Sequence, residues 1–417
     1  MNILLVKPPF ARLLQSDAYL TYPLGLMGVA AVLRAAGHDV TIYHDDVSNL
    51  DPIPRGHSRL GEVTYSHEQL EKSMGVFTHV LDGIRPDVVG VSYTTSDVVA
   101  ARMIAAECRN RGIRTVAGGI HPSLCPDDEM EFFDVVVAGE GDHPIVECMF
   151  KEKQYNPLNE PYYVLTPSTF SVADRDCVIW GEHYSPYLRG MIQTQRGCPY
   201  HCSFCAAPTV FGTKVRTRDP GAVREEVESL GVTSGRIIDD SFGVVKSHSL
   251  AVCHELEKVN YSWVCDMAVR DVDEELLDAM VAAGCGQINL GVESASEKWR
   301  ALSGKHVDAW TVRDAMAIAS ARGVAVVLYF MIGWPGETSE ELGATLAVAQ
   351  SLKDEGAKPH ISIVTPYPGT KLWDMCDVAD RGDWSSFMHQ SRDMGFADVP
   401  PDVWAQALQT ATRINGG

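Results

Sequence analysis

Short apolar runs alternate with amphipathic stretches along the first 150 residues. The runs predict strands at 3–6, 39–43, 88–93, 115–118 and 135–138, and the stretches predict helices at 24–36 and 98–110. Because the runs are apolar throughout and helix-length segments lie between them, we expect a parallel sheet covered by helices on both faces. This region is therefore predicted to form a doubly wound, Rossmann-like α/β domain, with ligands at the carboxyl ends of its strands.

A second alternation starts at residue 191. Strands are predicted at 191–195, 236–238, 263–268, 287–291, 325–332 and 361–364, and helices at 222–230, 247–259, 273–283, 312–322 and 337–352. Six β/α units are too few for the closed eight-stranded barrel, so we expect an open, partial (β/α)6 TIM-like barrel. Its site should lie at the carboxyl ends of the strands.

The domain boundaries follow from these patterns. Residues 151–188 lack periodicity and contain several prolines, so we interpret them as a linker with a short hairpin. The Rossmann-like domain is then 1–150 and the barrel domain 189–372. Residues 373–417 form a polar C-terminal extension that is too short for another domain.

Composition and charge narrow the possible partners. The 417 residues are 45% hydrophobic and 22% charged, which is typical of globular proteins. The net charge of -20 disfavours nucleic-acid binding, because that binding depends on clustered Lys and Arg. No apolar run approaches the roughly 18 residues that span a membrane, and the N-terminus lacks signal-peptide features. We expect a cytoplasmic protein with no membrane partner.

Three cysteines lie close together directly after the first predicted barrel strand. Cys198, Cys202 and Cys205 have the spacing C-x3-C-x2-C, so one compact loop can aim three thiolates at one metal centre. Thiolates select iron–sulfur clusters or zinc, and a structural zinc normally takes a fourth ligand, for which His201 is available. Three thiolates on a four-iron cluster leave one iron open for a substrate. By spacing alone, the loop fits either an iron–sulfur cluster or a zinc ion.

The cysteine motif, with Phe204 before its last cysteine, resembles the signature of the radical S-adenosylmethionine (SAM) superfamily. That resemblance implies a [4Fe-4S] cluster whose open iron binds SAM and cleaves it to methionine and a 5'-deoxyadenosyl radical. The radical would abstract hydrogen from a small-molecule substrate. An electron donor such as flavodoxin or ferredoxin is implied as a partner.

Other segments of the barrel extend the resemblance to residues 190–372. The segment 291–294 resembles the strand end whose acid, here Glu293, binds the SAM ribose, and Gly333 opens a turn similar to one that approaches adenine. The superfamily often shows Gly-Gly-Glu after the second strand, where this chain has Asp239 and Asp240 instead. We keep both acids as candidates for SAM binding, together with Phe204 and with Arg270, which could face the SAM carboxylate. For Glu293 and Gly333, a solvated acid and an ordinary turn are the alternatives.

The first 150 residues resemble the cobalamin (B12)-binding-type domain that precedes the radical SAM core in a large subfamily. The similar elements are Pro8-Pro9, Pro23–Leu26, Pro86–Ser92, Gly118–Pro122 and Gly139–Asp142. No Asp-x-His-x-x-Gly segment occurs, so a bound cobalamin would have its lower base displaced. We expect the slot for its nucleotide tail to be lined by Ser92, Thr94, Thr95, Gly118 and Gly119. His121 is interpreted as a turn histidine with backbone partners rather than a cobalt ligand, and a domain without corrin is the alternative.

Several functions fit these two domains. We favour cobalamin-dependent methylation of a carbon centre in a natural-product precursor; the alternative is cobalamin-independent radical dehydration, epimerisation or cyclisation with a structural first domain. A corrinoid carrier or sensor is a third possibility. A tRNA methylthiotransferase is disfavoured, because residues 1–107 contain no cysteine for a second cluster. Tyr200, Tyr329 and Tyr367 could deliver a proton or hydrogen atom, although aromatic packing explains each of them as well.

Overall fold

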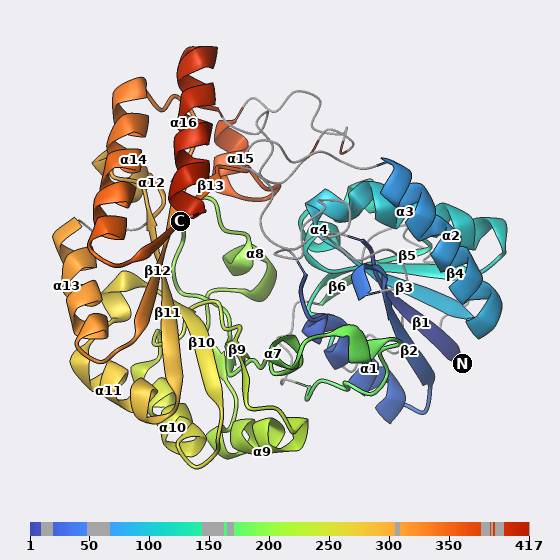
Figure 1. Cartoon of the computed structure of the whole chain (residues 1–417). Helices are drawn as coiled ribbons and strands as arrows, with labels where there is room; N and C mark the ends of the chain where they lie inside the picture. The colour runs from blue at the N-terminus through green and yellow to red at the C-terminus, as the bar shows by residue number, and fades with distance from the viewer. Residues whose placement is uncertain are drawn as a thin grey trace.

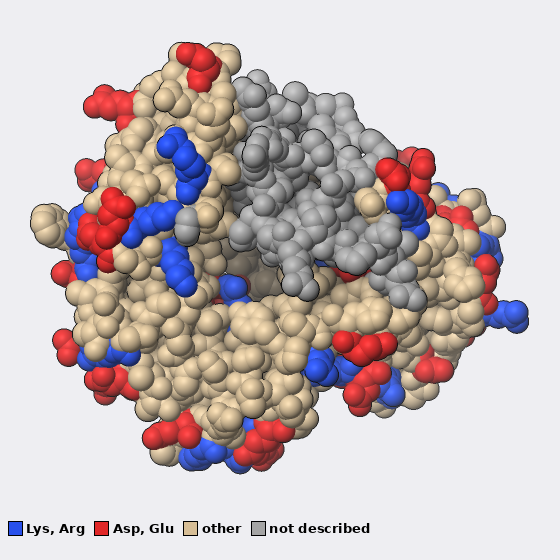
Figure 2. All heavy atoms as spheres, viewed as in Figure 1, with Lys and Arg blue, Asp and Glu red and all other residues tan. Residues whose placement is uncertain are grey.

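The computed structural model describes residues 1–9, 20–47, 67–143, 162–164, 171–304, 309–376, 384, 387 and 396–416. Two parallel sheets organise these residues into two lobes (Figure 1). Within the described part of the chain, no helix is long and apolar enough to cross a bilayer. On the face drawn in Figure 2, acidic and basic side chains are mixed around the periphery, and the surface is hollowed where the lobes meet.

The first sheet is parallel throughout, with the strand order β2-β1-β3-β4-β5-β6. Its strands are β1 (Asn2–Lys7), β2 (Asp39–His44), β3 (Val88–Ser92), β4 (Arg114–Gly118), β5 (Val135–Gly139) and β6 (Tyr162–Val164). Because β1 pairs with β2 on one side and β3 on the other, the order reverses between β1 and β3. That reversal is the switch point at which such sheets bind ligands.

Helices cover both faces of this sheet, which confirms the doubly wound prediction. Helix α1 (Leu24–Ala35) packs Met27 and Ala30 against one face. The opposite face is covered by α2 (His67–Ile84) and α3 (Val98–Asn110). Helix α2 lies in a stretch where no helix was predicted.

The second sheet is open and parallel, with the order β13-β12-β11-β10-β9. Its strands are β9 (Ser234–Ile237), β10 (Ser262–Met267), β11 (Cys285–Glu293), β12 (Ala325–Ile332) and β13 (Lys358–Ile363). The connecting helices are α9 (Pro220–Leu230), α10 (Lys246–Leu256), α11 (Glu274–Ala282), α13 (Ala309–Ser320) and α14 (Ser339–Asp354). This is the predicted partial barrel.

The first barrel strand, predicted at 191–195, is reduced to one bridge. Ile192 pairs with Ile237 of β9, and the chain then leaves the sheet. The amides of Thr194 and Gln195 donate to the carboxylate of Asp239, at 2.6 and 3.0 Å, instead of continuing a strand ladder. A side chain has therefore replaced the neighbouring strand as the hydrogen-bond acceptor.

The segments outside the two sheets attach to them at several points. The predicted linker 151–188 is described only in part: residues 162–164 form β6, and Val178 pairs with Ile42 of β2. Its role as a linker stays a prediction. In the C-terminal extension, α16 (Pro401–Asn415) lies beside α14 (Figure 1), and the Asn415 side chain bonds both backbone polar groups of Ile361. The helix thus covers the edge strand β13, which would otherwise offer unpaired backbone groups.

Candidate functional site

The three motif cysteines lie on a loop closed by a short antiparallel ribbon, β7 (Gln195–Arg196) with β8 (Arg216–Thr217). Cys198 donates its amide to the carbonyl of Gly212 at 3.4 Å, and Cys205 donates to Cys202 at 3.1 Å. Gly197, which precedes the first cysteine, has φ +94°, and a Cβ there would stand 2.7 Å from the carbonyl oxygen of Lys214. Only glycine lets the two sides of the loop approach so closely.

The loop is held from one side by the residues that follow β10. The hydroxyl of Tyr200 donates to the carboxylate of Asp271 at 2.8 Å, and the Arg270 guanidinium lies 4.5 Å from the centre of the Tyr200 ring. Arg270 also donates to the carbonyl of Gly304 at 3.0 Å. Arg270 therefore contacts the cysteine loop, and its interaction with a SAM carboxylate stays a prediction.

Aromatic packing holds the loop from the other side. Phe204 meets Trp334 edge-on at 6.2 Å, and Trp334 stacks on Trp299 at 5.7 Å. Gly333, with φ +88°, precedes Trp334 and donates its amide to Glu337 Oε2 at 2.7 Å. The structure thus brings Phe204 and the Gly333 turn together, as a shared SAM site requires.

Asp239 and Asp240 follow β9 and lie beneath the loop. Both carboxylate oxygens of Asp239 accept hydrogen bonds: Oδ1 from the amides of Thr194 and Gln195, and Oδ2 from the hydroxyl of Thr194. Burial raises the pKa of Asp239 to about 7. Asp240 accepts from the amide of Gly197 at 3.0 Å, and burial also raises its pKa. Both acids thus position the start of the cysteine loop, while direct contact with SAM stays a prediction.

Glu293 ends β11 in a strained conformation. Its φ is +72°, its exposed fraction is 6%, and the pairing with β12 shifts register between Gly291 and Glu293. A bulky residue with positive φ costs about 1–3 kcal/mol, and such strain concentrates at functional sites. This conformation distinguishes Glu293 from a solvated surface acid.

Buried polar atoms without a hydrogen-bond partner flank the loop and the Gly333 turn. They are Gln195 Oε1, Ser203 Oγ and Glu337 Oε1, on residues that are at most 2% exposed. Since buried polar atoms are normally bonded, these atoms fit a site that takes up a polar cofactor. Burial raises the pKa of Glu337 to about 7.

The described residues contain no site for a single metal ion: no three of their His, Cys, Asp or Glu side chains converge as ligands of one ion. In a four-iron cluster each cysteine binds a different iron, so the three thiolates need not converge in that way.

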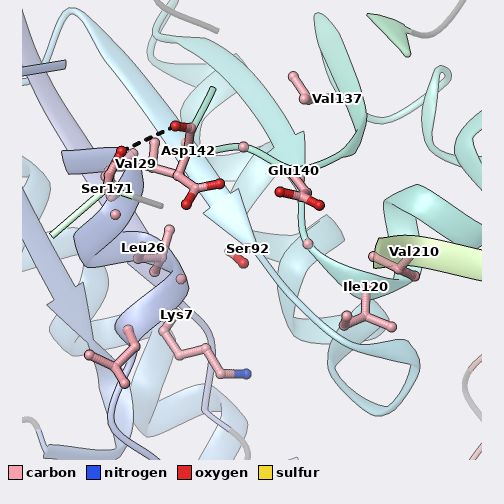
Figure 3. Close-up of a pocket in the computed structure, with 18 of the residues that line it drawn as sticks. Lys7, Leu26, Val29, Ser92, Ile120, Val137, Glu140, Asp142, Ser171 and Val210 are labelled. Atoms are coloured by element: carbon pink, nitrogen blue, oxygen red, sulfur yellow. Dashed lines mark hydrogen bonds between the residues drawn. The ribbon is translucent and has the colours of Figure 1, made fainter. Parts of the chain in front are cut away.

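A pocket of about 340 Å³ opens at the carboxyl ends of the first sheet (Figure 3). Its lining includes four of the five residues predicted for the cobalamin slot, namely Ser92, Thr94, Gly118 and Gly119. The fifth, Thr95, does not line the pocket: it is buried, and its Oγ1 lies 3.2 Å from His121 Nδ1. The second lobe contributes Val210 and Phe211 of α8 (Ala207–Phe211), the helix that begins two residues after Cys205. The pocket therefore lies where the two lobes meet, and the cysteine loop leads directly into its wall.

Lys7 and two acids add charge to this pocket. Figure 3 shows the Lys7 ammonium pointing across the pocket, and it lies 2.8 Å from Asp97 Oδ2. Glu140 and Asp142 come from the turn after β5, and the Asp142 carbonyl accepts from Ser171 at 3.3 Å (Figure 3). The sequence placed these segments at the sheet edge without indicating which side chains face the cavity.

His121 is fully buried and does not line this pocket. Its Nδ1 lies 3.2 Å from Thr95 Oγ1, and its Nε2 lies 3.4 Å from Glu129 Oε1. The partners of the ring are thus side chains, rather than the backbone groups that were expected. That His121 is not a cobalt ligand stays a prediction.

The three candidate tyrosines lie in different surroundings. Tyr200 is bonded to Asp271, as described above. Tyr329 lies on β12 near Arg236, and burial raises its pKa. Tyr367 packs against Phe387 at 5.7 Å. A role for any of them as a hydrogen or proton donor stays a prediction.

Comparison with known proteins tests the resemblance directly. The model of the radical SAM superfamily matches residues 192–349, which include the cysteine loop. Residues 192–349 are therefore a radical SAM domain. A second model, the B12 binding domain, matches residues 13–149, so a cobalamin-binding-type domain precedes the radical SAM domain.

Relatives of this radical SAM chain match most of its length. An uncharacterized methyltransferase of Pyrococcus horikoshii is 28% identical over 90% of the chain and 83% of its own length. The cytidylyl-2-hydroxyethylphosphonate methyltransferase of Streptomyces wedmorensis is 26% identical over 90% and 81%. The solved structure of the radical SAM methyltransferase TsrM from Kitasatospora setae, with cobalamin and a [4Fe-4S] cluster bound, has a TM-score of 0.67 at 19% identity. That comparison covers 89% of this chain and 73% of TsrM, and it supports the shared fold.

The family sets the cofactors of this radical SAM enzyme: a [4Fe-4S] cluster, SAM and cobalamin. The residues present fit them. The three motif cysteines lie on one loop, buried polar atoms without partners lie beside that loop, and the first lobe has a pocket at its switch point.

Proposed function

We propose that this chain is a cobalamin-dependent radical SAM methyltransferase that methylates a carbon centre of a small-molecule, natural-product substrate. The observation that carries the proposal is the pocket between the lobes. One wall holds four of the five residues predicted for cobalamin, and another is formed by α8, directly after Cys205. A corrin in that pocket would lie beside the cluster loop, where a methyl group and a substrate radical have to meet.

The relatives support methyl transfer. The proteins from Pyrococcus horikoshii and Streptomyces wedmorensis and the structural neighbour TsrM are all named methyltransferases. These names do not give the substrate of this chain.

The residues of the chain divide the work of the site. Cys198, Cys202 and Cys205 hold the cluster, while Glu293 and the Gly333 turn hold SAM at neighbouring strand ends. Ser92, Thr94, Gly118 and Gly119 accommodate the nucleotide tail of cobalamin. When bound, the cluster and SAM supply a 5'-deoxyadenosyl radical, and cobalamin supplies the methyl carrier. Flavodoxin or ferredoxin supplies electrons, and the protein works in the cytoplasm without nucleic-acid or membrane partners.

Products of SAM test this function. The reconstituted, reduced enzyme should form S-adenosylhomocysteine, which is left when SAM gives up its methyl group, as well as 5'-deoxyadenosine. A cobalamin-independent dehydratase, epimerase or cyclase would form 5'-deoxyadenosine alone. Formation of S-adenosylhomocysteine should require added hydroxocobalamin. If no S-adenosylhomocysteine forms when hydroxocobalamin is present, the proposal is contradicted.

A further inference from the structure

Two arginines lie opposite each other at the base of the cysteine loop. Arg196 of β7 and Arg216 of β8 are paired residues of the antiparallel ribbon. Like charges directly opposite each other destabilise such a ribbon. All three cysteines lie between these two arginines along the chain. A group that neutralises the two arginines therefore also holds together the two ends of the cysteine loop.

The neutralising charge comes from the other lobe. Arg196 and Arg216 each donate to Glu140 Oε2 at 2.9 Å, and Arg216 makes a second bond to Glu140 Oε1. Arg196 also contacts both oxygens of Asp142, at 2.9 and 3.1 Å. The Glu140 and Asp142 side chains are 5% and 7% exposed. Removing one partner of such a buried pair is costly, because it leaves an uncompensated charge.

The turn that carries these acids also lines the pocket for cobalamin. Glu140, Gly141 and Asp142 all line that pocket, and Figure 3 shows the Glu140 and Asp142 side chains there. The turn is packed tightly against α1: a Cβ at Gly141 would lie 3.1 Å from Val29 Cγ2, and one at Gly28 would lie 3.2 Å from the Asp142 Cβ. Because Glu140 in this turn is bonded to both Arg196 and Arg216, a ligand that shifts the turn must shift the two arginines as well.

We infer that Glu140 is a positioning residue that couples occupancy of the cobalamin pocket to the geometry of the cysteine loop. The inference rests on the proposed function only in naming cobalamin as the occupant. Coupling of this kind is reciprocal: if cobalamin changes the cluster loop, the cluster must change the affinity for cobalamin by the same factor.

The test compares dissociation constants for hydroxocobalamin in the cluster-loaded and cluster-free full chain. In the wild type the two constants should differ by about fivefold or more, the usual lower range for coupled sites. In Glu140→Gln, which removes the charge and keeps the size, the ratio should fall to about one. A purely structural role would shift both constants equally and preserve the ratio. That result, or a wild-type ratio of one, would overturn the inference.

Two further variants make the comparison specific. Glu129→Gln removes another buried carboxylate of the first lobe, which is paired with Arg102 at 2.7 Å, and it should leave the ratio at the wild-type value. If Glu140→Gln does not fold, Arg216→Lys keeps the charge, removes the two-pronged contact with Glu140 and should lower the ratio.

A separate readout distinguishes failure of the inference from failure of the proposed function. If the wild type binds no hydroxocobalamin, the proposed methyl transfer fails, and the other half of the inference, that Glu140 positions the cysteine loop, is then read from the reduced cluster alone. Its electron paramagnetic resonance spectrum should change in Glu140→Gln and not in Glu129→Gln. Identical spectra in all three proteins would overturn the inference.

Discussion

Gly119 packs so closely against Tyr93 that a Cβ at Gly119 would lie 2.8 Å from the amide nitrogen of Tyr93 and 2.9 Å from its carbonyl oxygen. The φ and ψ of Gly119 are +100° and -163°, a region that is essentially restricted to glycine. Gly119→Ala should therefore destabilise the first lobe by about 1–3 kcal/mol from backbone strain alone, with the clash added. Thermal unfolding of the full chain should show a lower midpoint.

The neighbouring Gly118 provides the matched control. A Cβ there meets nothing closer than the carbonyl oxygen of Val137 at 4.0 Å, and Gly118 lines the pocket. Gly118→Ala should keep the wild-type unfolding midpoint but place a methyl group in the pocket and weaken hydroxocobalamin binding. Equal midpoints for the two variants would contradict this account of the turn.

Glu293→Gln tests the strained strand end. Hydrogen bonds to a charged group contribute about 1.5–3 kcal/mol, so loss of the carboxylate should weaken SAM binding by roughly 10- to 100-fold. The unfolding midpoint should change little, because Gln can occupy the same space. Equilibrium dialysis of SAM with the cluster-loaded protein measures the effect. Glu297→Gln, an exposed acid four residues further on, should bind SAM like the wild type.

Glu337 should make stability depend on pH. Burial raises the pKa of Glu337 from 4.5 to about 7, so the folded chain binds more protons than the unfolded chain between these values. The stability contributed by this group is therefore greatest below pH 4.5 and is lost as the pH rises to about 7, by roughly 3 kcal/mol at most. Glu337→Gln removes this loss, because the amide carries no charge.

Unfolding midpoints of the cluster-free chain at several pH values test the Glu337 prediction. Glu337→Gln should stabilise the protein relative to the wild type more at pH 8 than at pH 5. A constant difference between the two proteins across this range would show that Glu337 does not titrate with a raised pKa.

Cys202→Ala tests the cluster ligands. With one of three thiolates removed, the reconstituted protein should lose its cluster iron and its 5'-deoxyadenosine production while staying folded and soluble. Cys125→Ala, in the first lobe outside the loop, should retain both. Iron analysis and product quantification measure the outcome, and 5'-deoxyadenosine production retained by Cys202→Ala would refute the ligand assignment.

Sequence patterns predicted the strands of the first sheet well because β1, β3 and β5 are buried on both faces and are nearly continuous apolar runs. The strands of the second sheet alternate buried with less buried positions, and the regular spacing of helix-length segments between them was the signal there. Helix α2 was not predicted because its apolar residues, such as Leu70, Phe77 and Leu81, are spread among many polar ones. The first barrel strand was overestimated because the sequence does not reveal that Asp239 takes the amides of Thr194 and Gln195.

Some features of the candidate site were likewise predictable from the sequence, and others were not. Local spacing was enough to predict the cysteine loop, and a resemblance predicted the pocket residues. The contacts of Glu140 with Arg196 and Arg216 join residues 56 and 76 positions apart, so no local pattern indicated them. The positive φ of Glu293 likewise coincides with a register shift between β11 and β12, which no local pattern indicates. These features come from how the two lobes and the strands meet.

The most direct test of the central claim is the metal content of the protein after anaerobic reconstitution with iron, sulfide and hydroxocobalamin. The desalted protein should contain about four irons and one cobalt per chain, because the cysteine loop holds one four-iron cluster and the pocket holds one corrin. Four irons without cobalt would contradict cobalamin-dependent methylation and would favour a radical rearrangement with a structural first domain.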